Sequence, residues 1–125
     1  MIVGLGTDIV SVDRIAMVLE RNQSQFIDRI CTKDEKKYLQ QCKDIKTKLA
    51  KIWAVKEAAV KALGTGFKNG LVWAEIEILH KKDGQPYVCL SEKTEQLINE
   101  KGAKNIFVSL SDDYPFAQAV VIIEG

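Results

Sequence analysis

The sequence predicts an α+β fold in which an antiparallel sheet packs on a long central helix. Residues 52–66 (IWAVKEAAVKALGTG) have the apolar period of a helix and end in glycines. Later segments alternate between polar and apolar residues, and two of them are joined by Asp83-Gly84, a dipeptide typical of hairpins. The expected order is strand, helices, hairpin, helix and hairpin, which does not suit a doubly wound parallel fold.

Length and composition indicate one domain, residues 1–125, with a net charge of about +1. A charge so close to zero favours neither nucleic acid nor a membrane as partner. The N-terminal segment has neither the basic start of a signal peptide nor an apolar run long enough to span a membrane. A single histidine, His80, excludes a multi-histidine zinc site and is expected at the surface. The cysteines have no metal-ligand or redox spacing, which predicts reduced thiols and a cytoplasmic location: Cys31, Cys42 and Cys89.

Residues 1–10 are rich in β-branched side chains and predict a buried strand. Gly4 and Gly6 lie inside it, which indicates that another backbone comes close there. Because side chains alternate along a strand, these glycines share a face with Asp8 and Val10. Asp8 is either a carboxylate placed for function or a cap for the next helix, a role for which Ser11 competes.

Residues 11–21 predict a helix whose buried side carries Ile15, Val18 and Leu19. Arg14 and Arg21 lie seven residues apart and share an outward face, with Met17 or Val18 near it. This face is either a solvated basic surface or a docking surface for an acidic partner.

Two more helical segments precede the central helix. Residues 24–30 predict a short helical turn, and Thr32 and Glu35 form a capping box that starts a helix to about residue 42, with Tyr38 and Leu39 buried. Residues 43–48 are a basic loop or helix start, whose lysines are either solvated or turned toward phosphate.

The central helix has two different sides. An apolar row predicts contact with a core, and a second row places Trp53, Glu57 and Lys61 together; the apolar row is Ile52, Val55, Ala59, Ala62 and Leu63. Gly64 is expected to end the helix with a positive φ, and Gly66 lets the chain turn away.

The remaining chain predicts a loop over 67–70, a half-buried strand over 71–79 with Ala74 facing inward, and a return strand over 86–90. Ser91 caps a helix that ends at Gly102. Two final strands, 106–111 and 117–123, flank an Asp-Asp-Tyr-Pro turn.

Asp8 and Glu57 are distant in sequence but provide the two carboxylates that a magnesium site needs, since magnesium takes its other ligands from water and substrate phosphates. Lys61 lies one turn beyond Glu57. The alternative is an exposed Glu–Lys pair at i and i+4 with no further role. The lysine precedes Gly-Thr-Gly and follows no strand, which excludes a P-loop.

Three motifs together resemble the bacterial holo-[acyl-carrier-protein] synthases, small members of the 4′-phosphopantetheinyl transferase superfamily. They are GxGxDIV at 4–10 with Arg14 after it, WAxKEAxxKAxGTG at 53–66, and SLSxxxxxAxAxVI at 109–122. They cover nearly the whole chain in the order of the family. The resemblance therefore implies the phosphopantetheinyl transferase fold.

The resemblance also implies an activity: transfer of 4′-phosphopantetheine from coenzyme A to a serine of apo-acyl carrier protein, in fatty acid biosynthesis, with release of adenosine 3′,5′-bisphosphate. By motif position, Asp8 and Glu57 match the magnesium ligands, and Lys61 matches the lysine that contacts the attacked phosphate. Glu57, directly or through a metal-bound water, is the expected base. Gly64, Thr65 and Gly66 match the turn that lines the coenzyme A site. Arg14 and Arg21 match the basic positions that contact the carrier protein, and Val18 lies near them. Family members are homotrimers with active sites at subunit interfaces.

Two positions depart from the family pattern. Ile52 stands where an arginine often precedes the aromatic residue, so Lys48 or Lys51 is expected to supply the charge for the coenzyme A phosphates. Asp112 stands where a histidine often closes the SLSH element, and a carboxylate would repel a phosphate. Two alternatives to the transferase follow: a non-catalytic carrier-protein-binding module on the same fold, and a small protein that binds or hydrolyses nucleotides.

Overall fold

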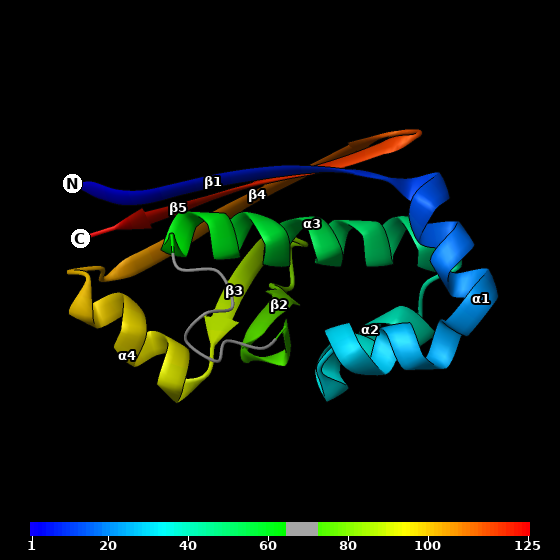
Figure 1. The fold of residues 1–125 in the computed structure, drawn as a ribbon, viewed down its shortest axis with the longest axis horizontal. Coiled ribbons are helices and arrows are strands. Elements are labelled where there is room, and N and C mark those ends of the chain that lie inside the picture. The colour runs from blue at the N-terminus through cyan, green and yellow to red at the C-terminus, as the bar shows by residue number, and fades with distance from the viewer. Residues whose placement is uncertain (65–72) are drawn as a thin grey trace.

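The computed structural model describes residues 1–64 and 73–125. Strand β1 and the first three helices are followed by a short 3-10 helix η2, a hairpin, a fourth helix and a second hairpin (Figure 1). The bounds are β1 Ile2–Ser11, α1 Val12–Ile30, α2 Lys33–Gln40, α3 Ile45–Leu63, η2 Trp73–Glu75, β2 Ile76–His80, β3 Pro86–Leu90, α4 Glu92–Glu100, β4 Asn105–Asp113 and β5 Phe116–Glu124.

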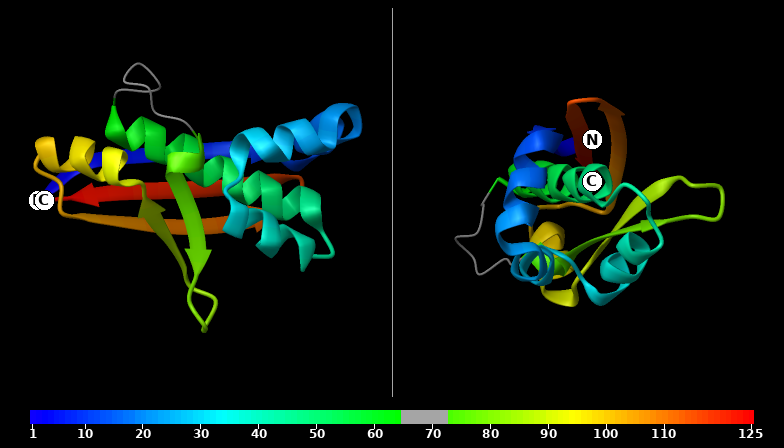
Figure 2. Two further views of the ribbon diagram at one scale, coloured as in Figure 1. Left: turned by 90° about the horizontal axis from the view of Figure 1, so that it is seen from below. Right: turned by 90° about the vertical axis from the view of Figure 1, so that its right-hand side faces the viewer.

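The strands form two antiparallel sheets, one of three strands in the order β1-β5-β4 and one of β2 and β3. The central helix α3 runs along the inner face of the three-stranded sheet. Helices α2 and α4 and the β2-β3 hairpin lie on the far side of α3, and α1 runs from the end of β1 past the end of α3 to the same side (Figures 1 and 2). This confirms the predicted α+β fold with an antiparallel sheet on a long central helix.

Gly4 and Gly6 allow β1 to lie directly against α3, as predicted. A Cβ added at Gly6 would stand 1.9 Å from the Ala58 carbonyl oxygen, and one at Gly4 would stand 2.4 Å from that of Ala62. Real Cβ atoms do not approach backbone this closely, so only glycine permits this packing. Asp8 follows on the same face and is thereby directed toward α3.

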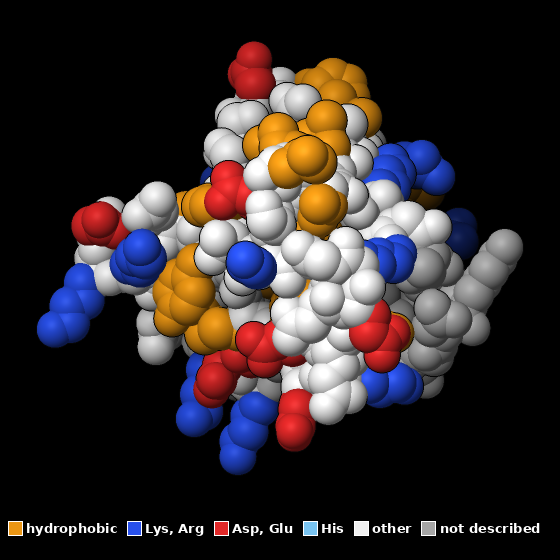
Figure 3. Space-filling model, turned by 90° about the vertical axis from the view of Figure 1, so that its left-hand side faces the viewer, with side chains coloured by type: hydrophobic (Ala, Val, Ile, Leu, Met, Phe, Trp, Pro, Cys, Tyr) orange, Lys and Arg blue, Asp and Glu red, His pale blue; other side chains and the backbone are white. Residues whose placement is uncertain are grey.

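The expectation that the first strand is buried is correct for only one of its faces. On the outer face, Leu5 is 62% exposed, Ile9 is 64% exposed, and Phe107 on β4 is 52% exposed. Leu5 and Phe107 both pair with Ile122 of β5, so these side chains share one surface. Figure 3 views the molecule from the end that carries the termini, and hydrophobic side chains gather in its upper part, where this sheet lies.

Helix α1 begins at its predicted cap, Ser11, whose side chain accepts a hydrogen bond from the Arg14 backbone N–H. The alternative role of Asp8 as that cap is therefore wrong. Backbone angles at Asn22 (φ −158°, ψ 58°) interrupt α1, so the two helical segments expected at 11–21 and 24–30 are joined across a kink. Val18 was expected on the buried side but is 37% exposed, because its face of α1 borders a pocket and not the core.

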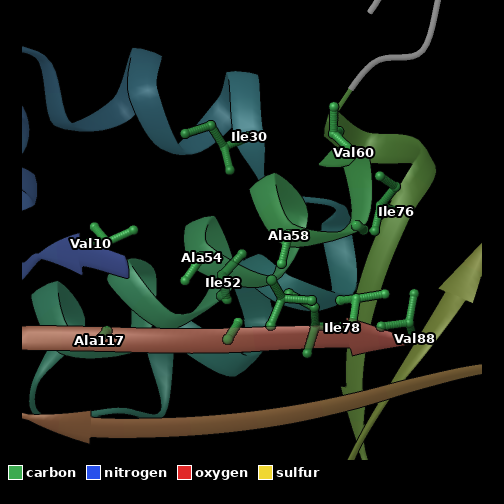
Figure 4. Close-up of a cluster of buried hydrophobic side chains, with 14 of the residues drawn as sticks. Val10, Ile30, Ile52, Ala54, Ala58, Val60, Ile76, Ile78, Val88 and Ala117 are labelled. Carbon is green, nitrogen blue, oxygen red and sulfur yellow. The ribbon is translucent and has the colours of Figure 1, made fainter. Parts of the chain in front are cut away.

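The start of the second helix and the end of the third match the prediction. Thr32 and Glu35 form the complete capping box of α2. Asp44 caps α3, which therefore begins inside the basic stretch, and Gly64 ends it with φ 78°. The inner side of α3 fills the core together with side chains from α1, β2, β3 and β5 (Figure 4).

Three details between α3 and β4 differ from expectation or lie outside the described residues. The strand expected at 71–79 begins only at Ile76, after η2, and Ala74 is exposed and does not face inward. The loop expected at 67–70 lies outside the described residues. His80, expected at the surface, is only partly exposed, because its ring stacks on Tyr38 with 4.6 Å between centroids.

The hairpin turn and α4 match the prediction. Gly84 adopts φ 93° between β2 and β3, Ser91 caps α4, and Gly102 follows the helix with φ 82°. No helix in the described part of the chain is long and apolar enough to cross a membrane.

Candidate functional site

Asp8, Glu57 and Lys61 meet at one pocket of about 450 Å³ between β1, α1 and α3. The fold brings Asp8 there because β1 lies against α3 through its glycines. Glu57 and Lys61 reach the pocket from successive turns of α3, as their spacing of four residues predicts. Trp53, one turn earlier on the same row, forms part of the wall.

Lys61 forms its ion pair with Asp8. Its Nζ lies 3.0 Å from Asp8 Oδ1 and donates a second hydrogen bond of 3.0 Å to the Thr7 carbonyl oxygen. The alternative of a simple surface pair with Glu57 is therefore wrong, because the lysine connects α3 to the strand. Its ammonium remains largely exposed and available to an incoming anion.

Glu57 lies in a less hydrated and more negative environment than an ordinary surface glutamate. Burial is the main cause that raises its pKa, the Asp8 carboxylate raises the pKa further, and Lys61 partly opposes both. The carboxylates of Asp8 and Glu57 therefore repel each other, which favours a cation between them.

These two carboxylates are the only candidate metal ligands that the pocket offers among the residues described. Over 1–64 and 73–125 there is no cluster of three or more His, Cys, Asp or Glu side chains that could hold a metal ion by itself. A pair of carboxylates suits an ion such as magnesium, which keeps waters and uses substrate phosphates as ligands.

The predicted docking residues are divided between two surfaces. Arg14 and Val18 border the pocket of Glu57 and Lys61. Arg21 is also exposed, but it lies beside the kink at Asn22 and borders a separate groove between α1 and α2. Arg21 thus borders a different pocket from Arg14 and Val18, although all three precede the kink.

The residues predicted for the coenzyme A site are also separated. Lys48 lies in a different pocket, of about 380 Å³, which also contains Lys51 and the stacked Tyr38 and His80. Gly64 ends α3 as predicted, and Thr65 and Gly66 lie outside the described residues.

The two departures from the family pattern lie close to this second pocket. Ile52 is buried and lines the pocket with its apolar side chain. Asp112 forms an ion pair with Lys51 at 2.5 Å. The Asp112 charge therefore compensates that of Lys51 and leaves Lys48 as the better candidate for binding phosphate.

Sequence reasoning missed a buried ion pair and an aromatic cluster beside the site. Lys56 and Glu35 pair within the interior at 2.7 Å, and Trp53 contacts the rings of Phe26 and Trp73. One signal was available for the ion pair: Lys56 interrupts the apolar side of α3 between Val55 and Ala59. A lysine in that position requires an acidic partner.

Comparison with known proteins identifies the family. The model of the 4′-phosphopantetheinyl transferase superfamily matches residues 4–119. The chain belongs to this superfamily. Among curated members, the holo-[acyl-carrier-protein] synthase of Yersinia enterocolitica is 42% identical over 124 residues, which cover 99% of this chain and 98% of that protein.

Solved structures of the superfamily have the same fold. The holo-[acyl-carrier-protein] synthase of Neisseria meningitidis has a TM-score of 0.94, is 34% identical and matches 100% of both chains. That of Helicobacter pylori, solved in complex with coenzyme A, has a TM-score of 0.84, is 28% identical and matches 96% of this chain and 99% of its own.

Proposed function

We propose that this protein is a holo-[acyl-carrier-protein] synthase. It moves the 4′-phosphopantetheinyl group of coenzyme A onto a serine of an apo-acyl carrier protein, releases adenosine 3′,5′-bisphosphate and serves fatty acid biosynthesis in the cytoplasm. The convergence of Asp8, Glu57 and Lys61 in one pocket supports the proposal best. All three lie within residues 4–119, which the superfamily model matches, and the full-length similarity to named synthases adds further support.

The residues of the pocket divide the chemistry among them. Lys61 neutralises charge on the phosphate under attack, and Glu57 accepts the proton of the serine hydroxyl. Asp8 orients Lys61 through their 3.0 Å contact. Asp8 and Glu57 would together hold magnesium, which when bound supplies positive charge to the pyrophosphate of coenzyme A. The mutual repulsion of these carboxylates supports such a cation.

We further propose that Lys48 binds phosphates of the coenzyme A nucleotide in a homotrimer. Lys48 and Glu57 are nine residues apart, which places them on opposite sides of a helix with 3.6 residues per turn. Lys48 of one copy is therefore best used by the site of a neighbouring copy. The exposed apolar face of the three-stranded sheet supports this association, because such a surface is typically covered by a partner.

The acyl carrier protein is the partner proposed for the basic side of α1. Arg14 and Val18 border the catalytic pocket, so an acidic protein docked there would present its serine to Glu57. Arg21 follows Arg14 by seven residues on the same helical segment, just before the kink, and would extend the positive surface along the same partner.

A mass spectrum of apo-acyl carrier protein after incubation with this protein, coenzyme A and magnesium tests the proposal. We expect a gain of one phosphopantetheinyl group, which EDTA abolishes and excess magnesium restores. A gain that is unaffected by EDTA would contradict the metal requirement alone. Carrier-protein binding without any mass gain would contradict the transferase and support the binding module that Ile52 and Asp112 suggest.

A further inference from the structure

A buried ion pair lies beside the catalytic pocket and has no part in the chemistry proposed above. Lys56 and Glu35 are both 0% exposed, and 2.7 Å separates Lys56 Nζ from Glu35 Oε1. Lys56 immediately precedes Glu57 on α3, whereas Glu35 belongs to α2. Replacement of a buried pair by apolar residues is often tolerated without loss of stability, so the other contacts of the pair indicate its role better.

The other hydrogen bonds of Lys56 hold two segments of main chain. Its Nζ donates to the Ile30 carbonyl oxygen at 2.5 Å, at the end of α1. It also donates to the Trp73 carbonyl oxygen at 3.0 Å, in η2. A single ammonium on α3 therefore fixes the end of α1 and the start of η2 to the same point of the helix.

The carboxylate of Glu35 holds two further backbone groups. Oε1 accepts from the Thr32 N–H at 2.8 Å, which completes the capping box of α2. Oε2 accepts from the Ile78 N–H at 2.9 Å and connects β2 to the same network. Both oxygens are used, so the buried pair is satisfied and rigid.

The position of the Trp73 backbone matters because the Trp73 side chain belongs to a wall of aromatic rings beside the catalytic pocket. We use the term aromatic wall for Phe26, Trp53 and Trp73. The ring centroids of Trp53 and Trp73 lie 4.6 Å apart, and those of Trp53 and Phe26 lie 5.8 Å apart. Phe26 and Trp53 line the pocket that contains Glu57. Trp73 does not line this pocket but packs against Trp53, and Lys56 donates a hydrogen bond to the Trp73 carbonyl oxygen.

We propose that Lys56 and Glu35 are positioning residues for phosphopantetheinyl transfer. The hydrogen bond from Lys56 to the Trp73 carbonyl fixes the aromatic wall and, through it, the side chain of Trp53 one turn before Glu57. Because Arg14 and Val18 border the same pocket, the wall limits the space into which the carrier protein is proposed to place its serine. This kinetic role rests on the proposed function, whereas the geometry of the wall does not.

Two variants separate positioning from stability. Lys56→Met combined with Glu35→Gln removes both charges and the bond to Trp73, and such a neutral replacement is expected to fold. Glu35→Gln alone keeps Lys56 and its bond to Trp73, but leaves a buried ammonium without its anion. The single variant should therefore have a lower Tm than the double variant. If the Glu35→Gln variant is too unstable to purify, Glu35→Asp is used in its place, because aspartate keeps the negative charge.

The chain offers a spectroscopic readout that does not depend on catalysis. Trp53 and Trp73 are its two tryptophans, and their rings are in contact, so near-ultraviolet circular dichroism reports on their mutual geometry. We expect the double variant to lose most of this signal while remaining folded. Its kcat/KM for the carrier protein should fall about tenfold or more, since small displacements near a reacting group are costly. Its KM for coenzyme A should change less.

Ile98→Ala is the matched control for stability, because Ile98 is buried in α4, away from the wall. It should lower Tm while retaining the tryptophan signal and kcat/KM. A folded double variant with the signal and kinetics of the natural protein would overturn the proposal. The proposal would also be overturned if the double variant lost no more tryptophan signal and no more kcat/KM than an Ile98→Ala protein of equal Tm. If the natural protein transfers nothing, the transferase proposal fails, while the tryptophan signal still decides whether Lys56 positions the wall.

Discussion

Lys61 Nζ lies 3.0 Å from Asp8 Oδ1 and thereby connects the central helix α3 to strand β1. The two residues are 53 positions apart in the sequence. Their contact orients the lysine from a residue outside its own helix, so that the ammonium faces the pocket shared with Glu57. An exposed pair of this kind contributes about 1 kcal/mol or less to stability.

We therefore expect Lys61→Met to lower activity strongly without unfolding the protein. Loss of one charge that stabilises a transition state typically reduces kcat by about 10²-fold or more, whereas the free energy of unfolding should change by no more than about 1 kcal/mol. Steady-state kinetics and thermal unfolding check the two expectations. Lys36→Met is the matched control, since Lys36 pairs with Asp28 on another surface and should keep full activity. An active Lys61→Met protein would remove Lys61 from the mechanism.

Gly6→Ala should destabilise the fold more than Gly4→Ala. The added methyl group would meet backbone oxygen at 1.9 Å in the first case and at 2.4 Å in the second, and helix backbone cannot move as a side chain can. Overpacking of this kind costs on the order of 1–3 kcal/mol, and Gly6→Ala is expected at the upper end. Urea unfolding measures the effect. Ser111→Ala, on the exposed side of β4, serves as the neutral control. Equal stability of all three variants would mean that β1 does not approach α3 this closely.

His80 should titrate below the ordinary histidine range. Burial against Tyr38 is the main cause that lowers the His80 pKa, and the charges of Lys48 and Lys51 lower it further. The unfolded chain, with a histidine pKa of about 6.5, therefore binds the proton more tightly than the folded chain. The stability that neutral His80 provides is complete above pH 6.5 and decreases as the pH falls through the folded-state pKa.

Nuclear magnetic resonance can follow this titration directly, because His80 is the only histidine in the sequence. We expect its ring protons to titrate with a midpoint below 6.5. In His80→Phe, which keeps the ring stack, the decrease in Tm between pH 7.5 and pH 5.5 should be smaller than in the natural protein. A midpoint at or above 6.5 would contradict the half-buried position of the ring.

Ile9→Lys should dissociate the proposed trimer. Ile9 belongs to the exposed apolar face of β1, and a lysine there would place charge in an interface that covers this face. Analytical ultracentrifugation should find trimers of the natural protein at micromolar concentration and monomers of the variant, with a retained circular dichroism spectrum. Tyr87→Lys, which also replaces an exposed apolar residue but lies on β3, should remain trimeric. A natural protein that sediments only as a monomer would contradict the trimer.

Local sequence signals predicted most elements of the fold. Each signal that succeeded acts over a few residues, such as the capping box from Thr32 to Glu35 and the glycine with positive φ at Gly64. The strand predicted at 71–79 was too long because Lys56, distant in sequence, holds the Trp73 backbone within a 3-10 turn. Val18 was placed on the wrong side because periodicity does not distinguish a core-facing row from one that faces a pocket.

The sequence by itself determined the α+β fold class, the row of Trp53, Glu57 and Lys61 on one helix, and the glycines that admit β1 to α3, because periodicity and backbone freedom are local properties. Only the tertiary structure decided that Lys61 pairs with Asp8, that Lys48 lies in another pocket, and that Lys56 pairs with Glu35 and donates to the Trp73 carbonyl. These relationships join residues from different elements. They depend on distances across the core, which no local pattern in the chain encodes.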